Sequence, residues 1–326
     1  MMLSRVVVIG LVAIVLAAAA TGAAFTVRQT TQDAEAGTTV TNDSSAVDPA
    51  PLEVLNWVYL GAGAAAVGLF FWRRWYRWGP GDGQLNVVSP IGGLAMGLVM
   101  IGIGVIGAQV AARLFGIEAD GQEPGSTSLA DSGRLQLGFY AAQGIVVAAF
   151  VWLVIRARRS ANVHGCRIVR AVWIGALALL LFWPIVNCAA VVANVMTEWF
   201  TNQTPALIAH TTLQQLVDNP VDRWSVLMVA LVLLAAPVYE EILYRGILQQ
   251  ATVGAGIARW PAILAISFFF AFVHLGTVPL HALPSLFVLS IGFGWIYEKT
   301  GRLSASIMMH AAFNLANLLL AWLSVG

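Results

Sequence analysis

The chain has 326 residues, of which 59% are hydrophobic and only 10% charged, and its formal net charge is +1. Soluble domains are typically about 45–50% apolar and about 25% charged. This chain therefore lacks the charged side chains that would cover a water-soluble surface of its size. The composition excludes an ordinary soluble enzyme and a disordered regulator, and the low net charge without a basic stripe excludes a nucleic-acid-binding protein. We predict an all-α, polytopic membrane protein.

Apolar runs long enough to cross a bilayer, which takes roughly 20 residues, recur along the whole chain. They are residues 6–26, 54–72, 91–112, 135–155, 171–195, 225–248, 261–278, 282–297 and 303–323. Arg5 precedes the first run and small residues follow it, so we interpret residues 1–26 as a secretory signal peptide or an uncleaved signal anchor. We expect the other eight runs to form a transmembrane helix bundle.

Composition divides the rest of the chain into three segments. Residues 27–51 are rich in Thr, Asp, Ser, Ala and Pro without an apolar period, and we interpret them as a disordered extracytoplasmic linker. Residues 52–219 contain four apolar runs and no motif, so they are N-terminal transmembrane helices of unknown role. Residues 220–326 contain the last four runs, together with the polar side chains described below.

Basic residues gather in alternate loops, and acidic residues gather in the loops between them. Arginines follow the second and fourth runs, Arg259 lies between the sixth and seventh, and Lys299 and Arg302 lie between the eighth and ninth. By the positive-inside rule, we predict a multi-pass protein of the cell membrane whose basic loops are cytoplasmic. Its C-terminus is then extracytoplasmic.

Polar side chains inside the last four runs need an explanation, because a charged group at the bilayer centre costs at least about 2.5–3.5 kcal/mol. Glu241 and Arg245 are four residues apart with the acid first, which favours an ion pair on one helix face. Glu240 points about 100° away from Glu241 and has no local partner. Burial would suit it to general-base chemistry. The alternative is that both acids only join helices.

Two further pairs of residues have the same four-residue spacing. His274 follows Phe270, and Asn314 follows His310, so each pair shares one helix face. A packing role for His274 and a helix-bridging role for Asn314 are the alternatives for each taken singly. Together with Glu240, they would form a site that activates water and supplies donors to an oxyanion.

Depth in the membrane tests whether these side chains can meet. At about 1.5 Å per residue, Glu240 and His310 lie roughly 10 Å from the cytoplasmic ends of their runs. His274 lies about 20 Å from that side if its helix begins at Pro261. We therefore expect either a tilted helix or a membrane-spanning part that begins near Ser267.

Three short motifs in these runs occur in the order and at the separations seen in a known family. They are Glu240-Glu241-x-x-x-Arg245, Phe270-x-x-x-His274 and His310-x-x-x-Asn314. Together they resemble the motifs of the CAAX prenyl protease and bacteriocin-processing family (CPBP, also called Abi). The resemblance covers roughly residues 220–322 and implies an intramembrane protease domain, to which we assign residues 220–326.

The resemblance also implies a role for each side chain. By the family's pattern, Glu240 and His274 would activate the attacking water, while His310 and Asn314 would stabilise the oxyanion. Glu241 and Arg245 would form a structural pair at the site. We therefore expect a glutamate-type endopeptidase that needs no cofactor.

Zinc is the alternative to a metal-independent reaction, because Glu240, His274 and His310 could supply three ligands. The chain has no HExxH motif, and each of these residues comes from a different motif. A glutamate that acts as general base requires no metal, which favours the metal-independent reading.

The expected substrate is a membrane-anchored or membrane-inserted protein or peptide. Eukaryotic relatives trim prenylated proteins, but the N-terminus of this chain looks bacterial, so that substrate is not carried over. One rival function is a non-proteolytic membrane scaffold or bacteriocin-immunity protein of the same fold. Another is a proton-coupled transporter, but we find neither inverted repeats nor polar groups spread along a path.

Overall fold

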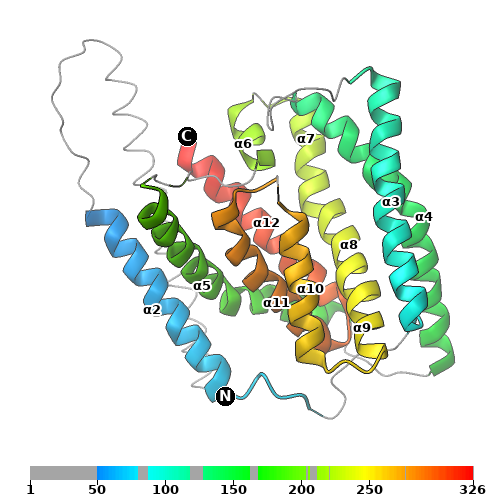
Figure 1. The fold of residues 1–326 in the computed structure, drawn as a ribbon, viewed down its shortest axis with the longest axis horizontal. Coiled ribbons are helices and arrows are strands. Elements are labelled where there is room, and N and C mark those ends of the chain that lie inside the picture. Colours follow the sequence, from blue (N-terminus) through cyan, green and yellow to red (C-terminus); the bar gives the residue numbers. More distant parts are fainter. Residues whose placement is uncertain are drawn as a thin grey trace.

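The computed structural model describes residues 50–79, 87–117, 128–161, 168–202, 205, 211–219, 221–275 and 277–325. The predicted signal segment and almost all of the predicted linker lie outside these residues. The described chain consists of helices joined by turns and contains no β-strand, which confirms the all-α class (Figure 1).

The four helices that precede the motif-bearing segment alternate in direction through the bundle. They are α2 (Ala50–Trp72), α3 (Pro90–Phe115), α4 (Leu129–Ala161) and α5 (Ile168–Thr201). The short α6 (Thr211–Asp218) follows them. In Figure 1, α2 and α5 lie on one side of the bundle and α3 and α4 on the other.

The motif-bearing segment begins with one long helix that changes its hydrogen-bonding register twice. Its parts are α7 (Arg223–Ala230), the π-helical η1 (Leu231–Ala235), α8 (Ala236–Glu241), the π-helical η2 (Ile242–Gln249) and α9 (Gln250–Gly254). Asp222 caps its N-terminus by accepting hydrogen bonds from two backbone N–H groups. Backbone hydrogen bonding at this cap lowers the pKa of the Asp222 carboxyl.

A helical hairpin and a final helix complete the segment. The hairpin consists of α10 (Arg259–Val273), the single 3₁₀ turn η3 (Leu280–Ala282) and α11 (Leu283–Thr300), and α12 (Leu303–Val325) follows. Seven helices of the described chain are long and apolar enough to cross a membrane, α7 to α9 counting as one of them. The protein is therefore a multi-pass membrane protein.

The predicted span 261–278 differs from the structure. Its helix α10 has only 15 residues and is about 22 Å long at 1.5 Å per residue, less than the roughly 30 Å of a hydrocarbon core. The chain turns back after Val273 and reaches Pro279 in an extended conformation. A proline disfavours helical geometry in the residue before it, so the helix cannot continue to residue 278.

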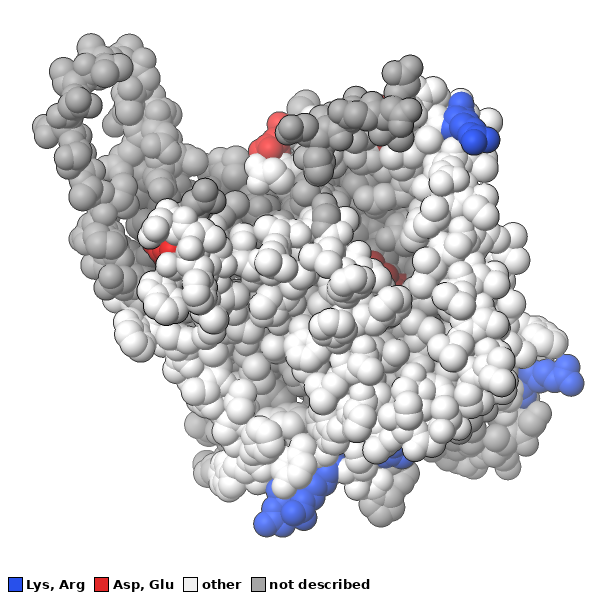
Figure 2. Space-filling model, in the orientation of Figure 1, with Lys and Arg blue, Asp and Glu red and all other residues white. Residues whose placement is uncertain are grey.

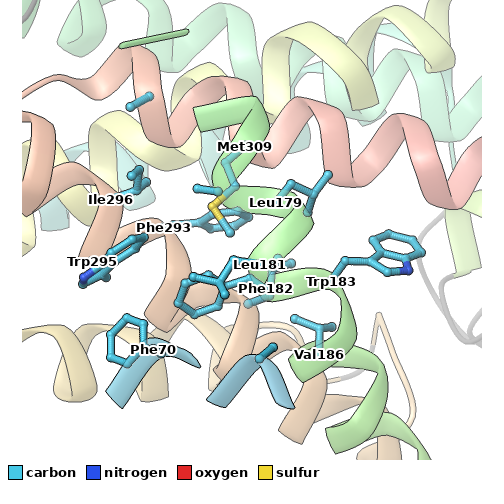
Figure 3. Close-up of a cluster of buried hydrophobic side chains, with 14 of the residues drawn as sticks. Phe70, Leu179, Leu181, Phe182, Trp183, Val186, Phe293, Trp295, Ile296 and Met309 are labelled. Atoms are coloured by element: carbon cyan, nitrogen blue, oxygen red, sulfur yellow. The ribbon is translucent and has the colours of Figure 1, made fainter. Parts of the chain in front are cut away.

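The central core packs α5 against α11 and α12. In Figure 3, Phe182 from α5 lies with Trp295 of α11, Met309 of α12 and Phe70 of α2. The ring centroids of Phe182 and Trp295 are 5.6 Å apart, and those of Phe182 and Phe70 are 6.3 Å apart. This cluster fixes the helix that carries the His310–Asn314 motif.

At the basic end of the bundle, side chains donate hydrogen bonds to three consecutive backbone carbonyls. Trp295 donates its indole N–H to the carbonyl of Trp75 at 3.0 Å, and Trp260 donates to the carbonyl of Tyr76 at 2.8 Å. Lys299 donates to the next carbonyl along the chain. Most Lys and Arg side chains visible in Figure 2 gather at this lower end. The prediction that this end faces the cytoplasm stays a prediction.

Gly175 provides a test of this packing. A Cβ atom on Gly175 would lie 2.1 Å from the backbone carbonyl oxygen of Ala305, so we expect Gly175→Ala to push α5 away from α12. Overpacking of this kind typically costs about 1–3 kcal/mol. Thermal unfolding of the purified protein in detergent measures the loss. Gly102→Ala is the matched control, because no atom lies within 4 Å of its added Cβ; equal midpoints for the two variants would contradict the packing described here.

Candidate active site

A fully buried ion pair joins Glu241 and Arg245 on the long helix. Arg245 donates from Nη1 to Glu241 Oε1 at 3.0 Å, and the two side chains are 1% and 0% exposed. From Nη2, Arg245 donates to the backbone carbonyl of Ser290 on α11 at 2.9 Å and to the Ser290 hydroxyl. The pair therefore links the long helix to α11.

Aromatic rings surround the Arg245 guanidinium. Its Cζ atom lies 5.1 Å from the ring centroid of Phe293, 5.2 Å from that of Phe270 and 5.8 Å from that of Tyr244. Aromatic faces attract a cation, and the attraction is strongest where water is excluded. These rings help to offset the cost of removing Arg245 from water.

His310 from α12 lies between the two glutamates. Its Nδ1–H donates to Glu241 Oε1 at 3.0 Å, because a paired carboxylate can only accept. The imidazole stacks on Phe293 with centroids 4.7 Å apart and planes at 19°. Its other nitrogen, Nε2, lies 4.0 Å from Glu240 Oε2. The Glu241 contact thus orients His310 toward Glu240.

Glu240 differs from its neighbour in having no strong partner. Its side chain is 25% exposed, and within the described chain its buried Oε2 atom makes no hydrogen bond. Figure 2 shows acidic atoms at the floor of a hollow in the middle of the visible face. Glu241, by contrast, is fully buried.

His274 lies at the end of α10 and reaches this group through Phe270. Its Nδ1–H donates to the backbone carbonyl of Phe270 at 2.7 Å, which leaves Nε2 as the acceptor in the neutral ring. The Phe270 ring lies 4.6 Å from the ring of His274 and 6.2 Å from that of His310. The structure therefore places the two histidines around one phenylalanine, with His310 rather than His274 beside Glu240.

Asn314 contacts the backbone of the long helix. It donates from Nδ2 to the carbonyl of Val232 at 2.9 Å. In this π-helical stretch each N–H bonds five residues back, as Ala236 does to Leu231, and Pro237 has no N–H for Val232. Asn314 thus satisfies a carbonyl that the proline leaves without a helical partner. One of its two amide N–H groups is used in this way.

The depths of the candidate residues agree, in contrast to the expected mismatch. The long helix continues to Gly254, fourteen residues beyond Glu240, which corresponds to about 21 Å. His274 follows the 15 residues of α10, which corresponds to about 22 Å. The mismatch arose because the run 225–248 ends six residues before the helix does.

His310 reaches the same level because α12 begins inside the bundle. The side chain of Leu303, its first residue, lies against Gly246. Gly246 is six residues from Glu240 and Leu303 is seven residues from His310, so both lie about 10 Å from that contact.

Several polar residues that support the site were missed by the sequence reasoning. Ser290 receives Arg245, and one turn away Gln249 donates to the buried Glu298 at 2.9 Å. Glu298 also lies 3.5 Å from the Arg259 side chain. The signal was present in the sequence, because position 249 extends the four-residue spacing of residues 241 and 245.

Glu240, His274 and His310 are the possible zinc ligands of the site. Within the described residues, no three His, Cys, Asp or Glu side chains converge closely enough to hold a metal ion. Nδ1 of His310 is engaged by Glu241, and Nδ1 of His274 by a backbone carbonyl. These bonds leave Nε2 of each histidine able to bind a ligand, so the choice between a metal-independent and a zinc-dependent reaction stays a prediction.

The two adjacent glutamates should differ in their effect on stability. Glu241→Gln removes the charge that compensates buried Arg245, and breaking a buried pair typically costs about 3–5 kcal/mol. Glu240→Gln is the matched control, because Glu240 has no paired charge at hydrogen-bond distance. Thermal unfolding in detergent compares the two. A loss of stability that is equal for both variants would contradict the assigned structural role of Glu241.

A comparison with known proteins finds one family whose model matches part of the chain. Residues 222–316 match the family model described as type II CAAX prenyl endopeptidase Rce1-like. No curated protein and no solved structure matches the chain. The match contains all six predicted site residues and begins at the cap of the long helix, while residues 1–221 remain unassigned. The resemblance stated from the three motifs is thus confirmed over residues 222–316, which are similar to the Rce1-like CAAX prenyl endopeptidases.

Proposed function

We propose that this protein is an intramembrane endopeptidase that hydrolyses a peptide bond in a membrane-anchored or membrane-inserted protein, with Glu240 as general base. One observation carries the proposal. The Glu240 carboxylate is partly exposed at mid-span and has a buried, unbonded oxygen 4.0 Å from His310 Nε2. The neighbouring Glu241 is instead bound to Arg245 and His310. The Rce1-like match supports a protease in general.

The attacking water would bind at the exposed part of the Glu240 side chain, which is 25% exposed, because Oε2 itself is buried. It would donate to the carboxylate. This is the arrangement that general-base activation of water requires.

The reaction can then be written with every proton placed. Glu240 takes a proton from the water as its oxygen bonds to the substrate carbonyl carbon, and the carbonyl oxygen becomes an oxyanion. His310, when it carries a proton on Nε2, donates a hydrogen bond to that oxyanion. When the C–N bond breaks, the protonated Glu240 gives its proton to the leaving amine. The products are a carboxylic acid and an amine.

His274 and Asn314 keep the roles implied by the family resemblance as proposals. The Nε2 lone pair of His274 can accept from the attacking water, since its Nδ1–H is bound to a carbonyl. Asn314 has a second amide N–H besides the one that contacts Val232. That group is available as an oxyanion donor.

Loss of proteolysis in Glu240→Gln is the central prediction. The variant keeps the shape of the side chain but cannot accept the proton of water, and general-base catalysis is typically worth about 10²–10⁴-fold. The membrane-proteome N- and C-termini are compared between cells that carry wild-type protein and cells that carry the variant, with expression matched by immunoblot. New termini present only with wild type are expected, and they name the substrate.

Identical termini from wild type and Glu240→Gln would refute the proposal. If the variant also complemented a deletion phenotype, the non-proteolytic scaffold or immunity function would replace it. Glu241→Gln does not serve as a control here, because loss of folding would remove activity for a different reason.

Chelation tests the proposed independence of metal. Because no step of the proposed reaction uses an ion, cleavage of an identified substrate by the purified protein should stay within about twofold after treatment with 1,10-phenanthroline. The non-chelating isomer 1,7-phenanthroline is the control for solvent effects. Activity that is lost with the chelator and restored by zinc would replace the glutamate mechanism with a metal-assisted one.

A further inference from the structure

The residues around Glu240 include a wall from outside the Rce1-like domain. Tyr140 on α4 packs its ring against Tyr239, with centroids 5.1 Å apart, and Tyr239 directly precedes Glu240. One turn further along α4, a Cβ atom on Gly144 would lie 3.4 Å from the Tyr239 hydroxyl. Helix α4 therefore lies directly against the turn that carries the proposed base.

The Tyr140 hydroxyl is in a position to meet a ligand. The Tyr140 side chain is only partly buried, and it packs on Tyr239, the residue next to Glu240. In the described chain, its hydroxyl makes no hydrogen bond. It is also not among the buried polar atoms that lack a partner, so it is accessible. A tyrosine hydroxyl removed from bulk water normally finds a partner. A substrate bound at the partly exposed Glu240 side chain would supply one.

Tyr140 is held on a rigid support. Two residues before it, Gly138 approaches Gly107 of α3 so closely that a Cβ on Gly107 would lie 2.3 Å from the Gly138 carbonyl oxygen. Gln143, only 2% exposed, donates to the carbonyl of Met100 at 3.1 Å. These contacts lock α4 to α3. Side chains on a packed helix hold a ligand more accurately than side chains on a loop.

The α3–α4 pair is in turn fixed to the long helix. Cβ atoms on Gly93 and Gly97 of α3 would lie 2.6 Å from side-chain atoms of Ala251 and Leu248 respectively. The distance between α4 and the Glu240 turn is therefore set by close helix contacts. The Tyr140 hydroxyl is part of a preformed wall.

We propose that Tyr140 donates a hydrogen bond to a backbone carbonyl of the bound substrate, next to the peptide bond that is attacked by the water that Glu240 activates. This inference rests on the proposed protease function. A substrate segment must unwind locally to be cleaved, and each backbone group left unpaired in the membrane costs several kcal/mol. A phenol at the edge of the site satisfies one such group. The active site is then completed by α4, outside residues 222–316.

Kinetics of two phenol-to-phenyl variants test the proposal. The full-length proteins are reconstituted in liposomes with a peptide that spans a cleavage site identified from the Glu240-dependent termini. Tyr140→Phe should lower kcat/KM roughly 10-fold or more, because an unpaired buried carbonyl is left. The pH dependence of kcat/KM should stay unchanged, because Glu240 remains the base. Tyr239→Phe is the matched control and should stay within about twofold, because its hydroxyl faces α4.

The outcomes separate the two proposals. If wild type yields no Glu240-dependent termini, the protease function fails and the Tyr140 proposal fails with it. If wild type cleaves and Tyr140→Phe has the same kcat/KM, the Tyr140 proposal alone is overturned. A shifted pH profile would also overturn it, because Tyr140 would then act on Glu240 and not on the substrate.

Cross-linking provides a measurement that does not depend on activity. In the Glu240→Gln background, the photo-reactive residue p-benzoylphenylalanine replaces Tyr140 in one protein and Ile145 in another. Ile145 lies on the same helix and is 70% exposed on the outer surface. A substrate adduct at position 140 and none at 145 is expected. Adducts at neither position, or equal adducts at both, would refute the contact.

Discussion

The Glu241 carboxylate, which accepts hydrogen bonds from both Arg245 and His310, is the interaction on which the site depends. Removing an arginine from water inside a membrane protein is costly unless a paired charge and further acceptors surround it. Here one carboxylate oxygen satisfies groups from two helices, and Ser290 adds a third element, α11. The ion pair therefore stabilises the relative positions of the long helix, α11 and α12. It also explains why two glutamates are adjacent. Because Glu241 pairs with Arg245 and His310, Glu240 is left without a paired charge.

Register changes in the long helix place the glutamates between two π-helical stretches. Each stretch shifts the hydrogen bonds from four to five residues and rotates the side chains that follow. Pro237 would weaken such a helix, but Asn314 reaches across from α12 to the carbonyl of Val232. The two residues of the third motif lie on one face of α12 and both contact the long helix. His310 bonds the ion pair, and Asn314 bonds the π-helical stretch.

The helices before residue 222 are part of the same packed body as the Rce1-like domain. On one side, the rings of α5 and α2 form a core with α11 and α12. On the other, α3 meets the long helix through glycines, and α4 brings Tyr140 to the turn before Glu240. The family match, which is confined to residues 222–316, therefore covers the residues of the three motifs but not the whole of the wall around them.

The sequence by itself determined the membrane class, the helical fold and the six polar residues of interest. It could do so because charge inside an apolar run is expensive, and because a helix brings residues four apart onto one face, as with Glu241 and Arg245. Only the tertiary structure decided which acid pairs with His310, why Asn314 is needed, that α10 stops at Val273, and that Tyr140 lies beside Glu240. Those contacts join residues 69 or more positions apart or depend on where a helix ends. They are set by the tilt, rotation and starting depth of whole helices, and no local spacing in the sequence records these quantities.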